Sequence, residues 1–245
     1  MWFWRRFSLG SNINNLIKMK NIYIINGINS ELAQLFVKKL AKKDVVIGFH
    51  RSLYRGIKNK NILLTKSIKN LTLNIEKRIQ GEKKIIFINF AAMRDENLLL
   101  NLNLKEINTT LESNILSSLK IAKKIIPLMI KYNFGRFIFL SSKKAEQGSE
   151  GNILYSFSKS GLYGLSRSIS KEYRKFNITS NIISLGYFNS KMWISLNPSI
   201  QKRLLKETLY GKLGNPSVLH DAIKLIVKHQ FINMTKIDLD GGMLE

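Results

Sequence analysis

Residues 137–159, with the sequence FIFLSSKKAEQGSEGNILYSFSK, contain a strand, a loop and the start of a helix. The apolar run at 137–141 has the length of a buried strand, and Ser142 follows it directly. A loop with two glycines comes next, and from residue 154 onward the apolar side chains recur at helical spacing. In open α/β sheets, ligands bind where the strands end and the chain turns back through a helix. This stretch therefore predicts an α/β fold with a site at the end of the strand.

Tyr155 and Lys159 are four residues apart at the start of this helix, so both side chains emerge on one face. A nearby ammonium stabilises tyrosinate and lowers the pKa of the phenol, which makes it a usable proton donor near neutral pH. We expect Ser142 to donate a hydrogen bond to the same carbonyl oxygen that Tyr155 protonates. Tyr187 and Lys191 have the same spacing, so the position beside the strand end is what distinguishes the first pair.

Outward from this stretch, predicted strands and helices alternate along the chain. The strands are expected at residues 21–26, 45–48, 62–65, 85–90, 137–141, 181–184 and 236–239. The main helices are expected at residues 30–42, 116–132, 154–176 and 217–228. Continuous apolar strands separated by helices indicate a parallel sheet that is covered on both faces. The sequence thus predicts a three-layer, doubly wound α/β fold with a mainly parallel seven-stranded sheet. We expect one domain at 19–245, preceded by an extension of uncertain role at 1–18.

The first predicted strand leads into the sequence NGINSELA at residues 26–33. Here a glycine turn and the free N–H groups of a helix could bind a pyrophosphate. A similar turn occurs in α/β proteins that bind no nucleotide, with Asn29 or Ser30 capping the helix. For NAD, an acid should end the second strand and hold the ribose hydroxyls, but residues 45–75 contain no acid. Arg51 follows that strand instead, which suits a 2′-phosphate and favours NADP(H).

Further motifs occur in a fixed order along the chain: the turn at Gly27, NFAA at 89–92, Asn114, the group Ser142, Tyr155 and Lys159, and DGG at 240–242. Together they resemble the short-chain dehydrogenase/reductase family over residues 20–244. The segment RDENLL at 94–99 is similar to the 3-oxoacyl-acyl-carrier-protein reductases of that family. The segment SLGYF at 184–188 resembles sugar-modifying members instead. Glu31 and Ala33 replace two usual glycines, so a carboxylate near the pyrophosphate should weaken affinity unless it points away or is paired.

This resemblance implies a Rossmann fold and hydride transfer between a nicotinamide cofactor and a carbonyl or alcohol. Tyr155 would be the general acid of the reduction, and Ser142 would polarise the carbonyl. Lys159 would lower the pKa of Tyr155 and hold the nicotinamide ribose, while Asn114 would hold a water that relays protons to Lys159. The cofactor-binding residues expected from the turn, the second strand and the resemblance are Gly27, Ile28, Asn29, Arg51, Asn89, Ala91, Tyr155, Lys159 and Gly186.

We therefore expect an NADP(H)-dependent oxidoreductase that reduces a small-molecule or carrier-linked carbonyl substrate, such as a 3-oxoacyl thioester or a sugar-type compound. The resemblance also implies a homo-oligomer, either a tetramer or a dimer. The lost glycines leave open a second interpretation, a catalytically idle subunit or scaffold of a larger assembly. Residues 186–213 are expected to form a mobile apolar lid or, alternatively, an ordinary pair of surface helices.

Composition limits the other classes of function. Forty basic and 16 acidic residues give a net charge of +24, but the lysines are scattered along the chain, so nucleic-acid binding is a minor expectation. With no cysteine and three separated histidines, we expect neither thiol nor metal chemistry. No apolar run approaches the roughly 18 residues of a membrane span. We expect a cytoplasmic location, or a mitochondrial or plastid matrix if residues 1–18 are a transit peptide.

Overall fold

The computed structural model describes residues 20–41, 44–51, 56, 61–69, 71, 75–76, 83–94 and 96–243. The proposed extension at residues 1–18 lies outside them. Within the described residues, one parallel sheet has the strand order β3-β2-β1-β4-β5-β6-β7. The strands are β1 Lys20–Asn26, β2 Val45–Phe49, β3 Ile62–Thr65, β4 Lys83–Asn89, β5 Gly135–Ser142, β6 Ile178–Leu185 and β7 Lys236–Leu239. The predicted doubly wound, seven-stranded α/β fold is therefore confirmed.

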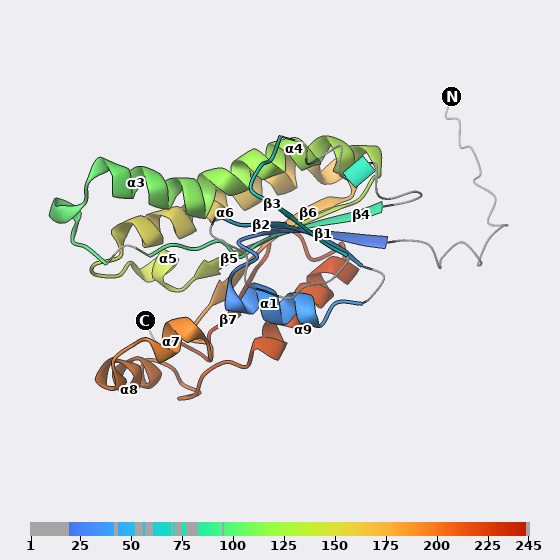
Figure 1. Cartoon of the computed structure of the whole chain (residues 1–245). Helices are drawn as coiled ribbons and strands as arrows, with labels where there is room; N and C mark the ends of the chain where they lie inside the picture. The colour runs from blue at the N-terminus through green and yellow to red at the C-terminus, as the bar shows by residue number, and fades with distance from the viewer. Residues whose placement is uncertain are drawn as a thin grey trace, which may run out of the picture.

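Helices cover both faces of the sheet (Figure 1). One face carries α3 (Leu104–Leu111), α4 (Ser117–Lys131) and α6 (Ile153–Tyr173), and the other carries α1 (Glu31–Lys38) and α9 (Pro216–Lys228). Three further helices, α5 (Lys144–Gln147), α7 (Lys191–Ile194) and α8 (Pro198–Lys206), follow the carboxyl ends of β5 and β6. Among the described residues, no helix is both long and apolar enough to cross a lipid bilayer.

Alternate side chains of the central strands feed two separate cores. In β1, Ile22 and Ile24 pack into the core below α4 and α6, whereas Tyr23 and Ile25 pack into the core above α1 and α9. Both faces of a parallel strand are buried in this way, which is why the strands read as continuous apolar runs. The two cores stabilise the sheet, and its ladders place the carboxyl ends of β1, β4, β5 and β6 side by side.

The helix that precedes β5 begins earlier than predicted. The sequence predicted it at 116–132, but α3 begins at Leu104, after a capping box in which Asn103 and Glu106 bond each other's backbone N–H groups. A π-helical turn, Glu112–Leu116, then joins α3 to α4. Leu104, Ile107 and Leu111 recur at helical spacing in this segment, so the earlier start of the helix could have been predicted from the sequence.

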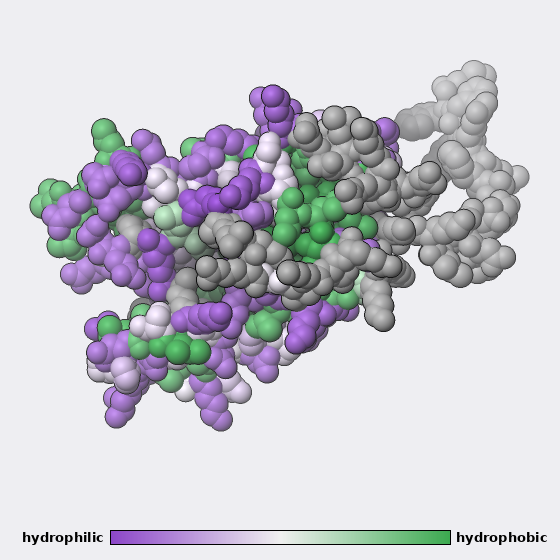
Figure 2. Space-filling view, in the orientation of Figure 1, coloured by the Kyte–Doolittle hydropathy of each residue, from purple (hydrophilic) through white to green (hydrophobic). Residues whose placement is uncertain are grey.

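On the face seen in Figure 2, most of the coloured surface is hydrophilic. Exposed hydrophobic residues nevertheless gather at the end of the molecule where α3 begins, and Leu100 and Leu104 are the most exposed there. A hollow separates α7 and α8 from the rest of the molecule in the same view. That hollow marks the position of the cleft described next.

Candidate active site

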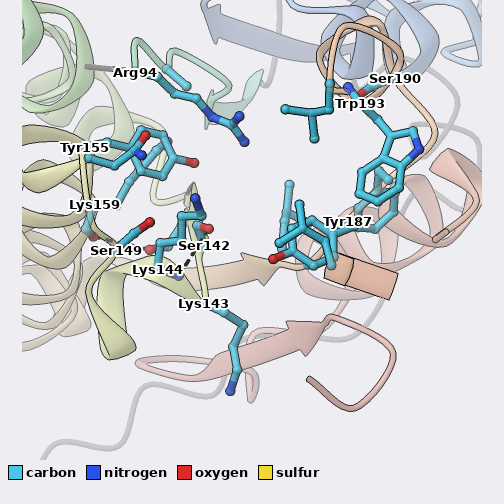
Figure 3. A pocket seen from close by; sticks show the side chains of 18 of the residues that line it. Arg94, Ser142, Lys143, Lys144, Ser149, Tyr155, Lys159, Tyr187, Ser190 and Trp193 are labelled. Atoms are coloured by element: carbon cyan, nitrogen blue, oxygen red, sulfur yellow. Dashed lines mark hydrogen bonds between the residues drawn. The ribbon is translucent and has the colours of Figure 1, made fainter. Parts of the chain in front are cut away.

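A cleft of about 690 Å³ lies at the carboxyl ends of the central strands. One wall comes from the end of β5 and the start of α6, and contains Ser142, Tyr155 and Lys159. The opposite wall comes from α7, α8 and the segment before them, and contains Tyr187 and Trp193. Figure 3 shows these two groups of side chains facing each other across open space. The cleft therefore lies where the sequence predicted a site, at the end of the strand that carries Ser142.

Tyr155 lies in the first turn of α6, almost fully buried, with its hydroxyl directed into the cleft (Figure 3). Burial raises the pKa of Tyr155, while the positive charge of Arg94 and a hydrogen bond from the Ser142 hydroxyl lower it. Tyr155 and Ser142 thus lie as the sequence predicted. The positive charge of Arg94 acts on the phenol, and the effect that the sequence predicted for Lys159 stays a prediction.

Lys159 is buried beneath Tyr155, with its ammonium 5.8 Å from the centre of the Tyr155 ring. Its Nζ atom donates hydrogen bonds to the backbone carbonyls of Leu140 at 2.8 Å and Ala91 at 3.2 Å. Burial lowers the pKa of Lys159 to about 7, so its charge is only partly present at neutral pH. The two carbonyls tie the ends of β4 and β5 to the helix that carries Tyr155.

Asn114 is fully buried in the π-helical turn and faces the segment that follows β4. Its Oδ1 atom accepts the backbone N–H of Met93 at 2.6 Å, and its Nδ2 atom donates to the Met93 carbonyl at 2.8 Å. The same Nδ2 donates to Ser158 Oγ at 3.0 Å, next to Lys159 in the chain. Asn114 therefore joins three segments of the site, and its predicted water relay stays a prediction.

Two amides beneath the cleft connect β1 and β4. Asn26 Nδ2 donates to Asn89 Oδ1 at 3.0 Å, and the same Asn89 oxygen accepts the Ala91 backbone N–H at 3.1 Å. The Asn89 side chain is fully buried and also donates to the Asn114 carbonyl at 3.4 Å. In the structure Asn89 braces the ends of the strands, and Ala91 offers its carbonyl to Lys159. Direct contact of either residue with a cofactor stays a prediction.

The turn after β1 is built around Gly27, which has a φ of +81°. A Cβ atom at this position would lie 2.6 Å from the backbone nitrogen of Ala91, so only glycine allows the turn to pack on the end of β4. The Ile28 side chain is fully buried in the core, so only its backbone is available to a ligand. Asn29 is exposed, and Ser30 lines the cleft.

Gly186 and Arg51, two of the predicted cofactor-binding residues, follow the ends of β6 and β2. Gly186 lines the cleft at the end of β6, where a Cβ atom would lie 2.6 Å from the Cα atom of Asp240. Arg51 is exposed two residues beyond Phe49. The Phe49 carbonyl accepts the backbone N–H groups of both Gly27 and Ile28 at 3.1 Å, so the end of β2 lies beside the glycine turn.

The wall opposite Tyr155 is aromatic. The rings of Tyr187 and Trp193 lie 5.4 Å apart, and the Tyr187 hydroxyl donates to Glu207 at 2.9 Å. Leu196 and Leu204 line the same wall. Residues 186–213, which the sequence predicted as an apolar lid, therefore form one side of the cleft, and their motion stays a prediction.

Three cations surround the cleft, and sequence reasoning missed two of them, Arg94 and Lys144. Arg94 and Lys144 lie just beyond the carboxyl ends of β4 and β5, and Arg203 is on α8. Figure 3 shows the Arg94 guanidinium directed into the cleft, whereas Lys143 points away from it, toward Glu146 and Asp240. The position of Arg94 and Lys144 just past strand ends was the available signal, since such residues converge at the binding edge of a parallel sheet.

The residues of the cleft fit one end of a nicotinamide dinucleotide better than the other. The cleft runs from Ser30, at the N-terminus of α1, past Gly186 to Tyr155 and Lys159, and the close packing at Gly27 leaves the turn flat against β4. These features suit a pyrophosphate and a nicotinamide ribose. Arg51 does not line the cleft, and residues 52–55 beside it lie outside the described residues.

Comparison with known proteins gives one family match and several curated relatives. Residues 26–201 match the family model described as short chain dehydrogenase. The chain is 29% identical, over 89% of its length and 95% of the relative's, to 3-oxoacyl-acyl-carrier-protein reductase FabG of Buchnera aphidicola from Acyrthosiphon pisum. It is 27% identical to the FabG reductase of Salmonella typhimurium, over 89% of this chain and 93% of that protein.

Solved structures show the same fold. A short chain dehydrogenase from Bacillus anthracis superposes with a TM-score of 0.78 at 20% identity, covering 90% of this chain and 95% of that one. A short chain dehydrogenase family protein from Francisella tularensis gives a TM-score of 0.76 at 17% identity, covering 91% and 98%. At these identities the superpositions speak for the fold alone.

Proposed function

Because the chain belongs to the short-chain dehydrogenase/reductase family and is an NAD(P)-dependent oxidoreductase, we propose that it reduces a carbonyl with Tyr155 as the general acid. The observation that carries this proposal is the position of Tyr155, whose hydroxyl is directed into the cleft, is hydrogen-bonded by Ser142 and lies above Lys159. An acid positioned in this way can protonate a carbonyl oxygen as charge develops on it.

The residues of this chain divide the proton chemistry between them. Tyr155 gives its proton to the carbonyl oxygen, and Ser142 donates a second hydrogen bond to the same oxygen. Burial holds the pKa of Tyr155 above its ordinary value, and the positive charge of Arg94 opposes that rise. Lys159, with its pKa of about 7, can return a proton to Tyr155 after each turnover. The bound nicotinamide supplies the hydride.

The cofactor proposed is NADP(H) in preference to NAD(H). Residues 45–75 contain no acid, and Arg51 lies beyond the end of β2, on the side of the glycine turn. We infer that the Gly27 turn and Ser30 hold the pyrophosphate, with Arg51 near the adenosine end. The FabG relatives are named as reductases of acyl groups on a carrier protein, so small-molecule and carrier-linked carbonyl compounds are both proposed as substrates.

The decisive experiment compares Tyr155→Phe with Tyr163→Phe, a matched change on the same helix. The Tyr163 hydroxyl bonds Glu146, and Tyr163 is not among the residues that line the cleft. Tyr155→Phe should lower kcat about 10²- to 10⁴-fold with NADPH binding retained. Tyr163→Phe should leave turnover unchanged. A Tyr155→Phe protein that keeps full turnover would refute the assignment, and a wild-type protein that binds neither nucleotide would favour the scaffold interpretation.

A further inference from the structure

Arg94 differs from the other cations of the cleft because one of its buried donor atoms has no hydrogen-bond partner among the described residues. It follows the end of β4, and its guanidinium carbon lies 5.9 Å from the centre of the Tyr155 ring. Figure 3 shows the guanidinium and the Tyr155 hydroxyl directed into the same open space. Among the described residues, no acceptor bonds the buried Nε atom of Arg94. A buried donor without a partner is costly, so an acceptor supplied by a ligand is expected here.

Two more cations reach this part of the cleft. Lys144 is half-buried two residues after Ser142, and Arg203 contributes from α8 on the opposite wall. Burial lowers the pKa of Lys144, and the positive charges of Arg94 and Arg203 lower it further. The three cations are thus close enough to repel one another, and a bound anion would relieve that repulsion.

The acids of the cleft do not neutralise this group. Glu207 raises the pKa of Lys144 in opposition to the cations, but this one carboxylate, which also accepts the Tyr187 hydroxyl, cannot balance three positive charges. Glu96 and Glu150 also line the cleft, and both are exposed to solvent, where water screens their charge. The space beside the Tyr155 hydroxyl is therefore positive, with a planar donor group on one side.

We propose that Arg94, assisted by Lys144, binds a carboxylate of the substrate, and that the protein reduces short oxo acids rather than uncharged carbonyl compounds. A guanidinium presents two parallel N–H groups that match the two oxygens of a carboxylate. This inference rests on the proposed function. In the reaction, the carbonyl carbon gains a hydride, its oxygen gains the Tyr155 proton, and the oxo acid becomes a hydroxy acid as NADPH is oxidised.

A matched pair of substrates tests the inference: acetoacetate, which carries a carboxylate, and methyl acetoacetate, in which an ester replaces it. In the wild-type protein kcat/KM with NADPH should be higher for the acid. Arg94→Met should lower the acid-to-ester ratio about 10- to 100-fold, and Arg94→Lys should lower it less. If Arg94 served only to tune the pKa of Tyr155, both substrates would slow equally. Arg167→Met, an exposed change on α6 outside the cleft, should leave the ratio unaltered.

A binding measurement separates this inference from the proposed function. Malonate, titrated by calorimetry at fixed ionic strength, should bind the wild-type protein and bind Arg94→Met at least about tenfold more weakly. If neither acetoacetate nor its ester is reduced but malonate binding depends on Arg94, the carboxylate site stands and the proposed reduction of these compounds fails. Equal malonate binding by wild type and Arg94→Met, or an unchanged acid-to-ester ratio, overturns the inference.

Discussion

The carboxylate of Glu31 accepts a hydrogen bond from the backbone N–H of Lys191, which joins the first turn of α1 to the first residue of α7. Glu31 stands where the family usually has a glycine. The bond to Lys191 shows that its carboxylate is paired with a backbone N–H group of α7. One carboxylate oxygen is directed at the wall of the cleft. The negative charge nevertheless remains in the helix turn that is expected to face the pyrophosphate.

Glu31→Gln should therefore raise the affinity for NADPH. The amide oxygen can still accept the Lys191 N–H, so only the charge is removed, and a single exposed charge at this range is worth up to about fivefold in affinity. The measurement is nicotinamide fluorescence at two salt concentrations, and the gain should shrink at the higher one. Glu96→Gln, which removes an exposed carboxylate that also lines the cleft, serves as the control. Equal gains from both variants would mean that overall charge is responsible.

Arg51→Ala should weaken NADPH binding about tenfold, the usual effect of losing one charge-assisted hydrogen bond to a phosphate, and leave NADH binding unaltered. Arg51 is exposed beyond β2, so its removal should not disturb the fold. Lys38→Ala, an exposed change in the last turn of α1, controls for the loss of a positive charge. An equal loss of affinity for both nucleotides would contradict the 2′-phosphate assignment.

Gly27→Ala should lower the free energy of unfolding by about 2 kcal/mol or more, since it adds a collision with Ala91 to the strain of a left-handed residue. Gly211→Ala is the matched comparison. Gly211 also has a positive φ, but a Cβ atom there would meet nothing within 4 Å, so only the strain applies. Denaturant titration of both variants measures the difference, and equal losses would show that the packing on Ala91 is unimportant.

Lys159 should make stability depend on pH. Its pKa is about 7 in the fold, against 10.5 for an ordinary lysine, so between these values the unfolded chain binds more protons than the native protein. The contribution of Lys159 to the free energy of unfolding therefore rises with pH from about 7 to 10.5. Lys159→Met removes this dependence, so its stability relative to wild type should be greatest below pH 7 and decline toward pH 10.5. Lys171→Met, an exposed change on α6, is the control, and a pH-independent difference for Lys159→Met would contradict the lowered pKa.

The outer face of α4 and α6 should hold copies of the chain together. Phe157 on α6 is 63% exposed and Leu119 on α4 is 49% exposed, which leaves apolar side chains on a helix face that solvent would otherwise cover. We expect a dimer or tetramer by light scattering, and a monomer for Phe157→Glu. Leu225→Glu changes a similarly exposed residue on α9, across the sheet, and should not alter the mass. A wild-type monomer would contradict the expected homo-oligomer.

The fold and the pair Tyr155 and Lys159 were predictable because local patterns specify them. Strand length, helical period and a four-residue spacing require no knowledge of distant contacts. The charge of Arg94 beside the phenol and the burial of Lys159 between two backbone carbonyls were not predictable. Ile28 was expected beside the pyrophosphate, yet its side chain fills the core under the turn. Both outcomes depend on how distant segments pack against each other. The spacing of residues along a single helix or strand carries no information about that packing.

The Asn114 side chain forms the two backbone hydrogen bonds with Met93 that a neighbouring strand would otherwise form. Its amide bonds both the N–H and the carbonyl of a single residue, 21 positions earlier, and so continues the pattern of a β-ladder beyond the end of β4 with one side chain. The next residue is Arg94, whose guanidinium is thereby aimed from a fixed backbone. The wide turn of a π-helix supplies the extra residue that brings Asn114 inward. Shortening that turn by one residue would rotate the amide by about 100°. The backbone of Met93, and with it the direction of the Arg94 side chain, would then lose the support of this amide.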